Sequence, residues 1–156
     1  MRTGVRLGVD VGKVRVGVSV CDRDGLVATP VATLTRGAPT VSELLTLLSE
    51  YNAVEAVVGL PLSLRGDDTA STTDARLLAA QLAALATVPV RLVDERLSTV
   101  SAQRALHQSG RSTKGSRAVI DQVAAVIILQ NALDAERSAG RPPGILVDPT
   151  QGRPTA

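Results

Sequence analysis

The sequence predicts an α/β fold: a mixed sheet of five strands, three antiparallel and then two parallel, with helices on both faces. Three apolar runs joined by short turns open the chain, a pattern typical of an antiparallel meander. Two later apolar runs each follow a segment with helical spacing of leucines. Strand–helix–strand units of this kind pair in parallel through right-handed crossovers.

The opening meander is marked by its turns. Gly12-Lys13 separates the first two runs, and Asp22-Arg23-Asp24-Gly25 separates the second from the third. Pro30 lies inside the third run and has no N–H to donate, so it predicts an edge strand or a bulge. The five strands are expected at 5–11, 14–20, 26–34, 54–60 and 90–94.

Helices are predicted where apolar residues recur at helical spacing, as Val41, Leu44 and Leu48 do behind the caps Thr40 or Ser42. Between the last two helices, residues 111–117 carry three positive charges and no apolar side chain, which predicts a loop. The helices are expected at 40–51, 69–86, 98–110 and 118–138.

Composition bounds the class of protein. A chain of 156 residues with 44% hydrophobic content can bury one core, expected over residues 1–138. Four prolines and three glycines gather in 139–156, which predicts a loose tail. No apolar run reaches the roughly 18 residues of a membrane span, the N-terminus lacks a signal-peptide pattern, and the single cysteine excludes an internal disulfide. We therefore expect a cytoplasmic protein.

Asp10 is the feature that calls for a functional explanation. It lies near the end of the first, almost wholly apolar strand. A carboxylate buried there is costly unless an Arg or Lys partner, backbone N–H groups or a metal cation compensates it. Lys13 or Arg15 could serve as that partner, so an ordinary salt bridge is one interpretation.

Further acids stand where the fold could bring them toward Asp10. Asp94 and Glu95 leave the last strand, at the edge where α/β sheets collect ligands, and alternation turns them to opposite sides. Asp121 shares a helix face with small alanines, which let the helix approach the sheet. A surface charge cluster and an ordinary first-turn acid are the alternative interpretations.

Three converging carboxylates need a compensating cation. Oxygen ligands suit Mg²⁺ or Mn²⁺, and the chain lacks the Cys/His clusters typical of zinc sites. Two such ions about 4 Å apart can activate water and stabilise the leaving oxygen of a phosphodiester. The hypothesis is a metal-dependent nuclease.

Four segments resemble the YqgF/RuvX family of small bacterial proteins with an RNase H-like fold. The resemblance spans about residues 5–135 and implies Asp10, Glu95 and Asp121 as the catalytic, metal-binding acids, with Glu95 preferred over Asp94. It implies processing of the 5′ end of precursor 16S rRNA, with Holliday junction resolution as the alternative. The segments are Asp10–Val18, Val57–Pro61, Asp94–Thr99 and Asp121–Leu129.

One departure from the resolvase pattern is Ala124, which stands where a fourth acid is expected. It weakens the resolvase interpretation more than the nuclease one, and it leaves open a non-catalytic nucleic-acid-binding factor in ribosome assembly. The Asp-x-Gly hairpin also resembles a phosphate loop of actin-like ATPases, although those proteins bind ATP between two such domains.

Basic residues on loops and strand ends are candidate phosphate contacts. With one Tyr and no Trp or Phe, base stacking on aromatic side chains is nearly excluded, so recognition is expected to depend on phosphates and shape. The expected partner is structured RNA or branched DNA, bound by a monomer or a homodimer. The candidate contacts are Arg15, Arg65, Arg96, Arg111, Lys114 and Arg117.

Overall fold

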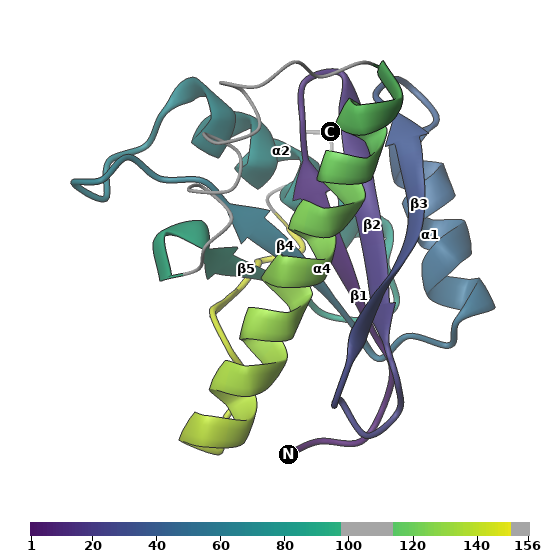
Figure 1. Cartoon of the computed structure of the whole chain (residues 1–156), viewed down its shortest axis with the longest axis vertical. Coiled ribbons are helices and arrows are strands. Elements are labelled where there is room, and N and C mark those ends of the chain that lie inside the picture. Colours follow the sequence, from purple (N-terminus) through teal and green to yellow (C-terminus); the bar gives the residue numbers. More distant parts are fainter. Residues whose placement is uncertain (98–113, 151–156) are drawn as a thin grey trace.

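A computed structural model describes residues 1–97 and 114–150 (Figure 1). The expected helix at 98–110 lies outside these residues. The elements are β1 (Arg6–Val11), β2 (Arg15–Cys21), β3 (Ala28–Thr35), α1 (Thr40–Glu50), β4 (Glu55–Leu60), α2 (Ala70–Leu85), β5 (Val90–Asp94), the 3₁₀ turn η1 (Glu95–Leu97), α4 (Lys114–Ala139) and β6 (Ile145–Leu146).

The strands form one mixed sheet in the order β3-β2-β1-β4-β5-β6. The first three strands pair antiparallel, and β1–β4 and β4–β5 pair in parallel, which confirms the predicted architecture. β3 is an edge strand, and its register with β2 shifts between Val18 and Ser19, opposite Ala32 and Pro30. The expectation of an edge strand or bulge at Pro30 is confirmed in both respects.

A sixth strand is the main difference from the expected sheet. Ile145 and Leu146 pair antiparallel with β5, and the N–H of Val147 donates to the carbonyl of Val90 at 2.8 Å. Val147 is buried. The chain after α4 therefore returns to the sheet, where a loose tail was expected from residue 139. Two paired residues are too few to produce a recognisable strand pattern.

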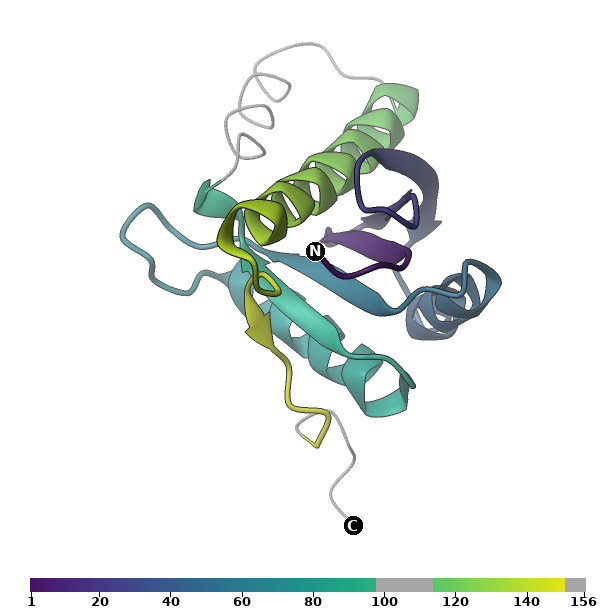
Figure 2. The same cartoon turned by 90° about the horizontal axis from the view of Figure 1, so that it is seen from below.

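The sheet separates two cores, each covered by helices (Figure 2). α1 and α2 cover the face that carries Leu7, Val9 and Val58. α4 covers the opposite face, where Val57 packs against Ile128 and Leu129. No helix in the described part of the chain is long and apolar enough to cross a membrane.

Helix boundaries differ from expectation by a few residues. Thr69 caps α2 and forms a reciprocal capping box with Thr72, as expected for a helix beginning there. α4 begins at Lys114, so the last part of the expected 111–117 loop is helical. The N-cap position of α1 is occupied by Pro39, without a side-chain capping hydrogen bond, so the expectation that Thr40 or Ser42 caps this helix is wrong. Thr40 is instead the first residue of α1, and its hydroxyl accepts a hydrogen bond from the N–H of Gly37 at 2.9 Å.

Glycines on three adjacent strands set the distance between α4 and the sheet. A Cβ added at Gly17 would overlap the main-chain oxygen of Asp121, and one at Gly59 would lie 2.5 Å from the Cδ1 of Ile128. At Gly8 it would lie 2.8 Å from the Cβ of Leu129. α4 therefore packs directly onto the backbone of β2, β1 and β4, at a separation that side chains on these strands would prevent.

Gly17→Ala is expected to lower the free energy of unfolding by about 1–3 kcal/mol, because the new methyl group meets helix backbone that can yield only by moving α4. Urea unfolding measures the effect. Gly37→Ala is the matched control, because its Cβ would meet only Pro39, at 3.6 Å. Equal stability of the two variants would contradict this account of the packing.

Candidate active site

Asp10 lies near the end of β1 and is almost completely buried, with 2% of its surface exposed. It pairs across β1–β2 with Gly17. On the other side, Val9 pairs with Val58 of β4, so the next step of the same register puts Gly59 beside Asp10. Asp10 therefore lies between two residues without side chains, on the face of the sheet that α4 covers.

Glu95 follows β5 directly as the first residue of η1, and only 3% of its surface is exposed. A Cβ added at Gly59 would lie 3.0 Å from the Oε1 of Glu95 and would also touch Ile128 of α4. The carboxyl group of Glu95 thus lies over Gly59, on the α4 face.

Adjacent carboxyl groups at this strand end have opposite pKa shifts. Burial raises the pKa of Glu95 to about 7, and the charge of Asp94 adds to the effect. The pKa of Asp94 is lowered, chiefly because Arg96 donates hydrogen bonds to it, the shortest of them 2.7 Å long. A carboxyl group that titrates near neutral pH in a buried position is a common feature of acid–base sites.

Asp121 lies in α4 with its main chain directly over Gly17. Its Oδ2 accepts a hydrogen bond from the Nε of Arg15 at 3.0 Å, and both side chains are about three-quarters buried. Arg15 is therefore the ion-pair partner of Asp121. The alternative in which Arg15 neutralises Asp10 is not what the structure shows.

The three acids form a row across one face of the sheet, with Asp121 over β2, Asp10 on β1 and Glu95 over β4. Their oxygen donors are of the type that Mg²⁺ and Mn²⁺ prefer. Among the described residues, however, no group of three acidic, His or Cys side chains is close enough to hold a metal ion. The three-carboxylate metal site stays a prediction.

The other candidate residues lie in different places around this face. Arg96 bonds to Asp94 rather than Glu95, and its guanidinium packs against Gly66 of the loop after β4. Arg65 is exposed in that same loop. Arg111 lies outside the described residues, and only the backbone of Lys114 and Arg117 is described, in the first turns of α4.

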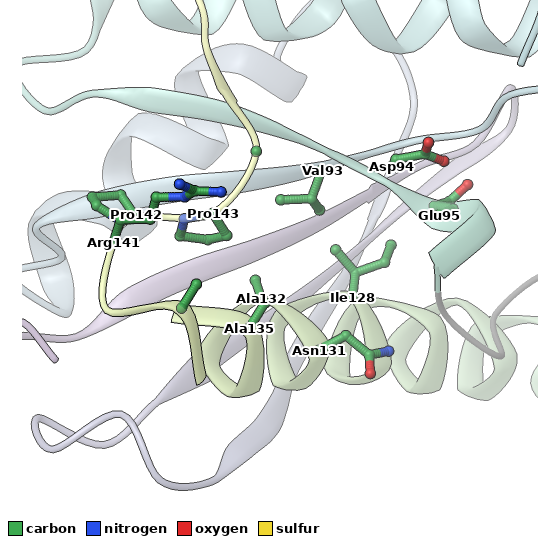
Figure 3. A pocket seen from close by; sticks show the side chains of 12 residues that line it. Val93, Asp94, Glu95, Ile128, Asn131, Ala132, Ala135, Arg141, Pro142 and Pro143 are labelled. Carbon is green, nitrogen blue, oxygen red and sulfur yellow. The ribbon is translucent and has the colours of Figure 1, made fainter. Parts of the chain in front are cut away.

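A pocket next to Glu95 was not anticipated from the sequence (Figure 3). It lies between β5, the second half of α4 and the segment 141–144. Asn131 and Arg141 line it, and neither was a candidate residue. The proline- and glycine-rich composition around Arg141 predicts a tail, and the pocket exists because that segment returns along the sheet to form β6.

The arrangement of sheet and helices is that of the RNase H-like fold found in RuvC. RuvC of T. thermophilus, solved in complex with a Holliday junction substrate, matches with a TM-score of 0.54 at 18% sequence identity. The match covers 89% of this chain and 99% of that one. At this identity, the comparison establishes the fold alone.

The family is established by sequence. The model described as "RuvX: Holliday junction resolvase" matches residues 4–135, and the chain belongs to this family. A relative from Clavibacter michiganensis subsp. michiganensis is 57% identical over 94% of this chain and 93% of its own length. One from Leifsonia xyli subsp. xyli is 53% identical over 97% and 99%. Both bear the name "Putative pre-16S rRNA nuclease". The resemblance inferred from the four segments is confirmed.

Glu95→Gln is expected to become more stable than the wild type as pH rises. The folded metal-free protein keeps the Glu95 proton up to about pH 7, whereas the unfolded chain releases it near 4.5, so the contribution of Glu95 to stability falls between these values. Gln has no proton to lose. The difference in free energy of unfolding between Glu95→Gln and the wild type should grow from near zero at pH 4.5 to about 3 kcal/mol at pH 8.

Urea unfolding across this pH range, without added metal, measures the difference. Glu50→Gln, at an exposed position in α1, is the control and should show no such growth. A Glu95→Gln difference that stays constant with pH would show that burial does not hold the proton on Glu95.

Proposed function

We propose that this protein is a metal-dependent nuclease that hydrolyses phosphodiester bonds at the 5′ end of precursor 16S rRNA, in the cytoplasm where ribosomes assemble. The observation that carries the proposal is the row of Asp121, Asp10 and Glu95 on one glycine-lined face, two of them almost completely buried. Carboxyl groups gathered near strand ends on one face of a sheet, one of them with a pKa of about 7, are typical of sites that carry out acid–base or metal-assisted chemistry. The names of the relatives supply the substrate.

In this proposal the three carboxyl groups, which in this structure are too far apart to share one ion, come together on Mg²⁺ or Mn²⁺ and hold it through oxygen atoms alone. When bound, such an ion supplies positive charge that polarises a phosphoryl oxygen and favours ionised water. That same charge would favour the ionised form of Glu95, whose pKa is about 7 in the protein alone. Metal binding should therefore release a proton from Glu95 at neutral pH.

Arg15 is assigned a positioning role in this proposal. Its hydrogen bond to Oδ2 fixes the carboxylate of Asp121, which is more exposed than the other two acids. Arg65, Arg96, Arg111, Lys114 and Arg117 are proposed as phosphate contacts. Contacts of this type position a strand without reading its sequence.

Holliday junction resolution is the second candidate function. The family description and the RuvC fold favour it. Against it stands Ala124, which is 4% exposed and packs in the core between α4 and the sheet, where a fourth acid is expected in resolvases. A three-acid set supports the nuclease proposal better.

Asp10→Asn and Asp121→Asn are each expected to lower the rate of cleavage at least about 100-fold. An ion that stabilises the transition state by several kcal/mol loses a ligand in each variant, and each tenfold change corresponds to about 1.4 kcal/mol. The assay measures cleavage of a precursor 16S rRNA 5′ leader and of a four-way DNA junction in parallel, with Mg²⁺ or Mn²⁺. Asp134→Asn, exposed on the same helix as Asp121, is the control and should cleave like the wild type.

The outcomes separate the candidate functions. Cleavage of the RNA that is lost with chelator and in both variants supports the proposal. Symmetric cutting of the DNA junction in preference to the RNA would instead support Holliday junction resolution as the function. Binding without cleavage by the folded wild type overturns the catalytic proposal and favours a non-catalytic assembly factor.

A further inference from the structure

The pocket beside Glu95 has a volume of about 400 Å³, within the range of about 300–1,000 Å³ that is typical of small-molecule sites. Its walls are aliphatic. Val93 comes from β5, and Ile128, Ala132 and Ala135 come from successive turns of α4. Figure 3 shows Asp94 and Glu95 at one end of the pocket, and Arg141 with Pro142 at the other.

We propose that this pocket binds one nucleotide of the substrate strand, next to the bond that is cleaved, with the base between the aliphatic walls and a phosphate at Arg141. The inference rests on the proposed function, because the occupant is part of the proposed substrate. It adds a specific site for one nucleotide and assigns roles to Arg141 and Asn131.

The shape and chemistry of the walls favour a nucleobase. A base that has left its stack needs apolar surface against its two faces and polar groups at its edge. Val93 and Ile128 offer the first, and alanines at 132 and 135 leave the width for a flat ring. The amide of Asn131, at the wall, carries both a donor and an acceptor, and within the described residues it forms no hydrogen bond.

The charges at the two ends of the pocket favour a ligand whose phosphate lies at the Arg141 end, away from Glu95. Arg141 is exposed and forms no ion pair with any residue that the structure describes. A guanidinium in this position can bind phosphate through two hydrogen bonds. At the opposite end the pocket reaches Glu95, one of the three acids of the candidate active site. A strand that places a base here therefore continues directly to the proposed site of cleavage.

The pocket also removes a difficulty raised by the composition. With one Tyr and no Trp or Phe, the chain has almost no aromatic side chains on which unpaired bases could stack. An aliphatic slot holds a base by apolar contact instead. Recognition then includes one base-sized contact in addition to phosphates and shape.

The first test is a titration of ¹⁵N-labelled protein with each of the four ribonucleoside 5′-monophosphates, followed by NMR. Saturable shifts are expected at residues 93–95, 128–135 and 139–144. Ala135→Leu narrows the pocket at an exposed helix position and should weaken binding at least tenfold. Ala70→Leu, at an exposed position in α2, is the matched control and should bind like the wild type. Shifts that are absent, or that lie elsewhere, overturn the proposal.

The second test examines Arg141 and the source of the nucleotide. Arg141→Gln should weaken binding of the monophosphates at least tenfold and leave binding of the corresponding nucleosides unchanged. Arg23→Gln, an exposed arginine in the β2–β3 turn, is the charge-matched control. A short RNA from the leader should displace the monophosphate and bind more tightly than it. If the free monophosphate binds more tightly than the RNA, the pocket belongs to a separate small ligand and the strand assignment is wrong.

These measurements do not depend on cleavage, so the two proposals fail separately. If nucleotides bind in the pocket but no RNA is cleaved, the proposed nuclease function fails and the pocket stands. If the wild type cleaves RNA while Ala135→Leu and Arg141→Gln bind and cleave as it does, the pocket proposal fails and the nuclease stands.

Discussion

The close approach of α4 to the sheet is the constraint on which the rest of the structure depends. Gly8, Gly17 and Gly59 allow helix and strands to meet backbone to backbone. The same contacts determine where the acids lie: the main chain of Asp121 rests on Gly17, and Glu95 shares the space above Gly59 with Ile128. Packing and site geometry are therefore one feature of this molecule, because any side chain that lifted α4 would also move Asp121 away from Asp10.

A buried network of charges fixes the other end of the same interface. Arg6, 1% exposed, donates to Glu136 of α4 at 2.7 Å, and Arg91 donates to the fully buried Glu55 at the same distance. Burial alone would raise the pKa of Glu136, but the hydrogen bond and charge of Arg2 and the charge of Arg6 outweigh it and lower the pKa. Glu95 differs, because burial and a like charge raise its pKa together. At this end of the interface, the arginine-paired Glu55 and Glu136 join α4 to the strands through Arg2, whereas Glu95, with a pKa near 7, is suited to chemistry.

The sequence predicted those features that are repeated over many residues or are local to one segment. Strands such as β5 and the extent of helices such as α2 were predicted because apolar periodicity is local to a segment. The cap of α1 was not, because the chain enters that helix at Pro39 rather than at Thr40 or Ser42. The ion-pair partners of charged side chains were not predicted, because they depend on strand register and on the rotation of the helix. Arg15 could have reached Asp10 or Asp121, and the position of α4 over Gly17 selects the second. β6 and the pocket were missed for a related reason: Ile145 and Leu146 form a strand only because β5 offers them an unpaired edge.

The departure at position 124 also follows from the packing of α4. Residues 121, 124, 125 and 128 share one helix face, and the side chains of Ala124, Ala125 and Ile128 are buried against the sheet. A carboxylate at 124 would enter the cluster that contains Val57 and Ile128, at the cost of burying a second charge one turn from Asp121. This chain therefore uses that turn of α4 to hold the helix close to the sheet, and its candidate chemistry rests on three acids and on the side chains that fix their positions.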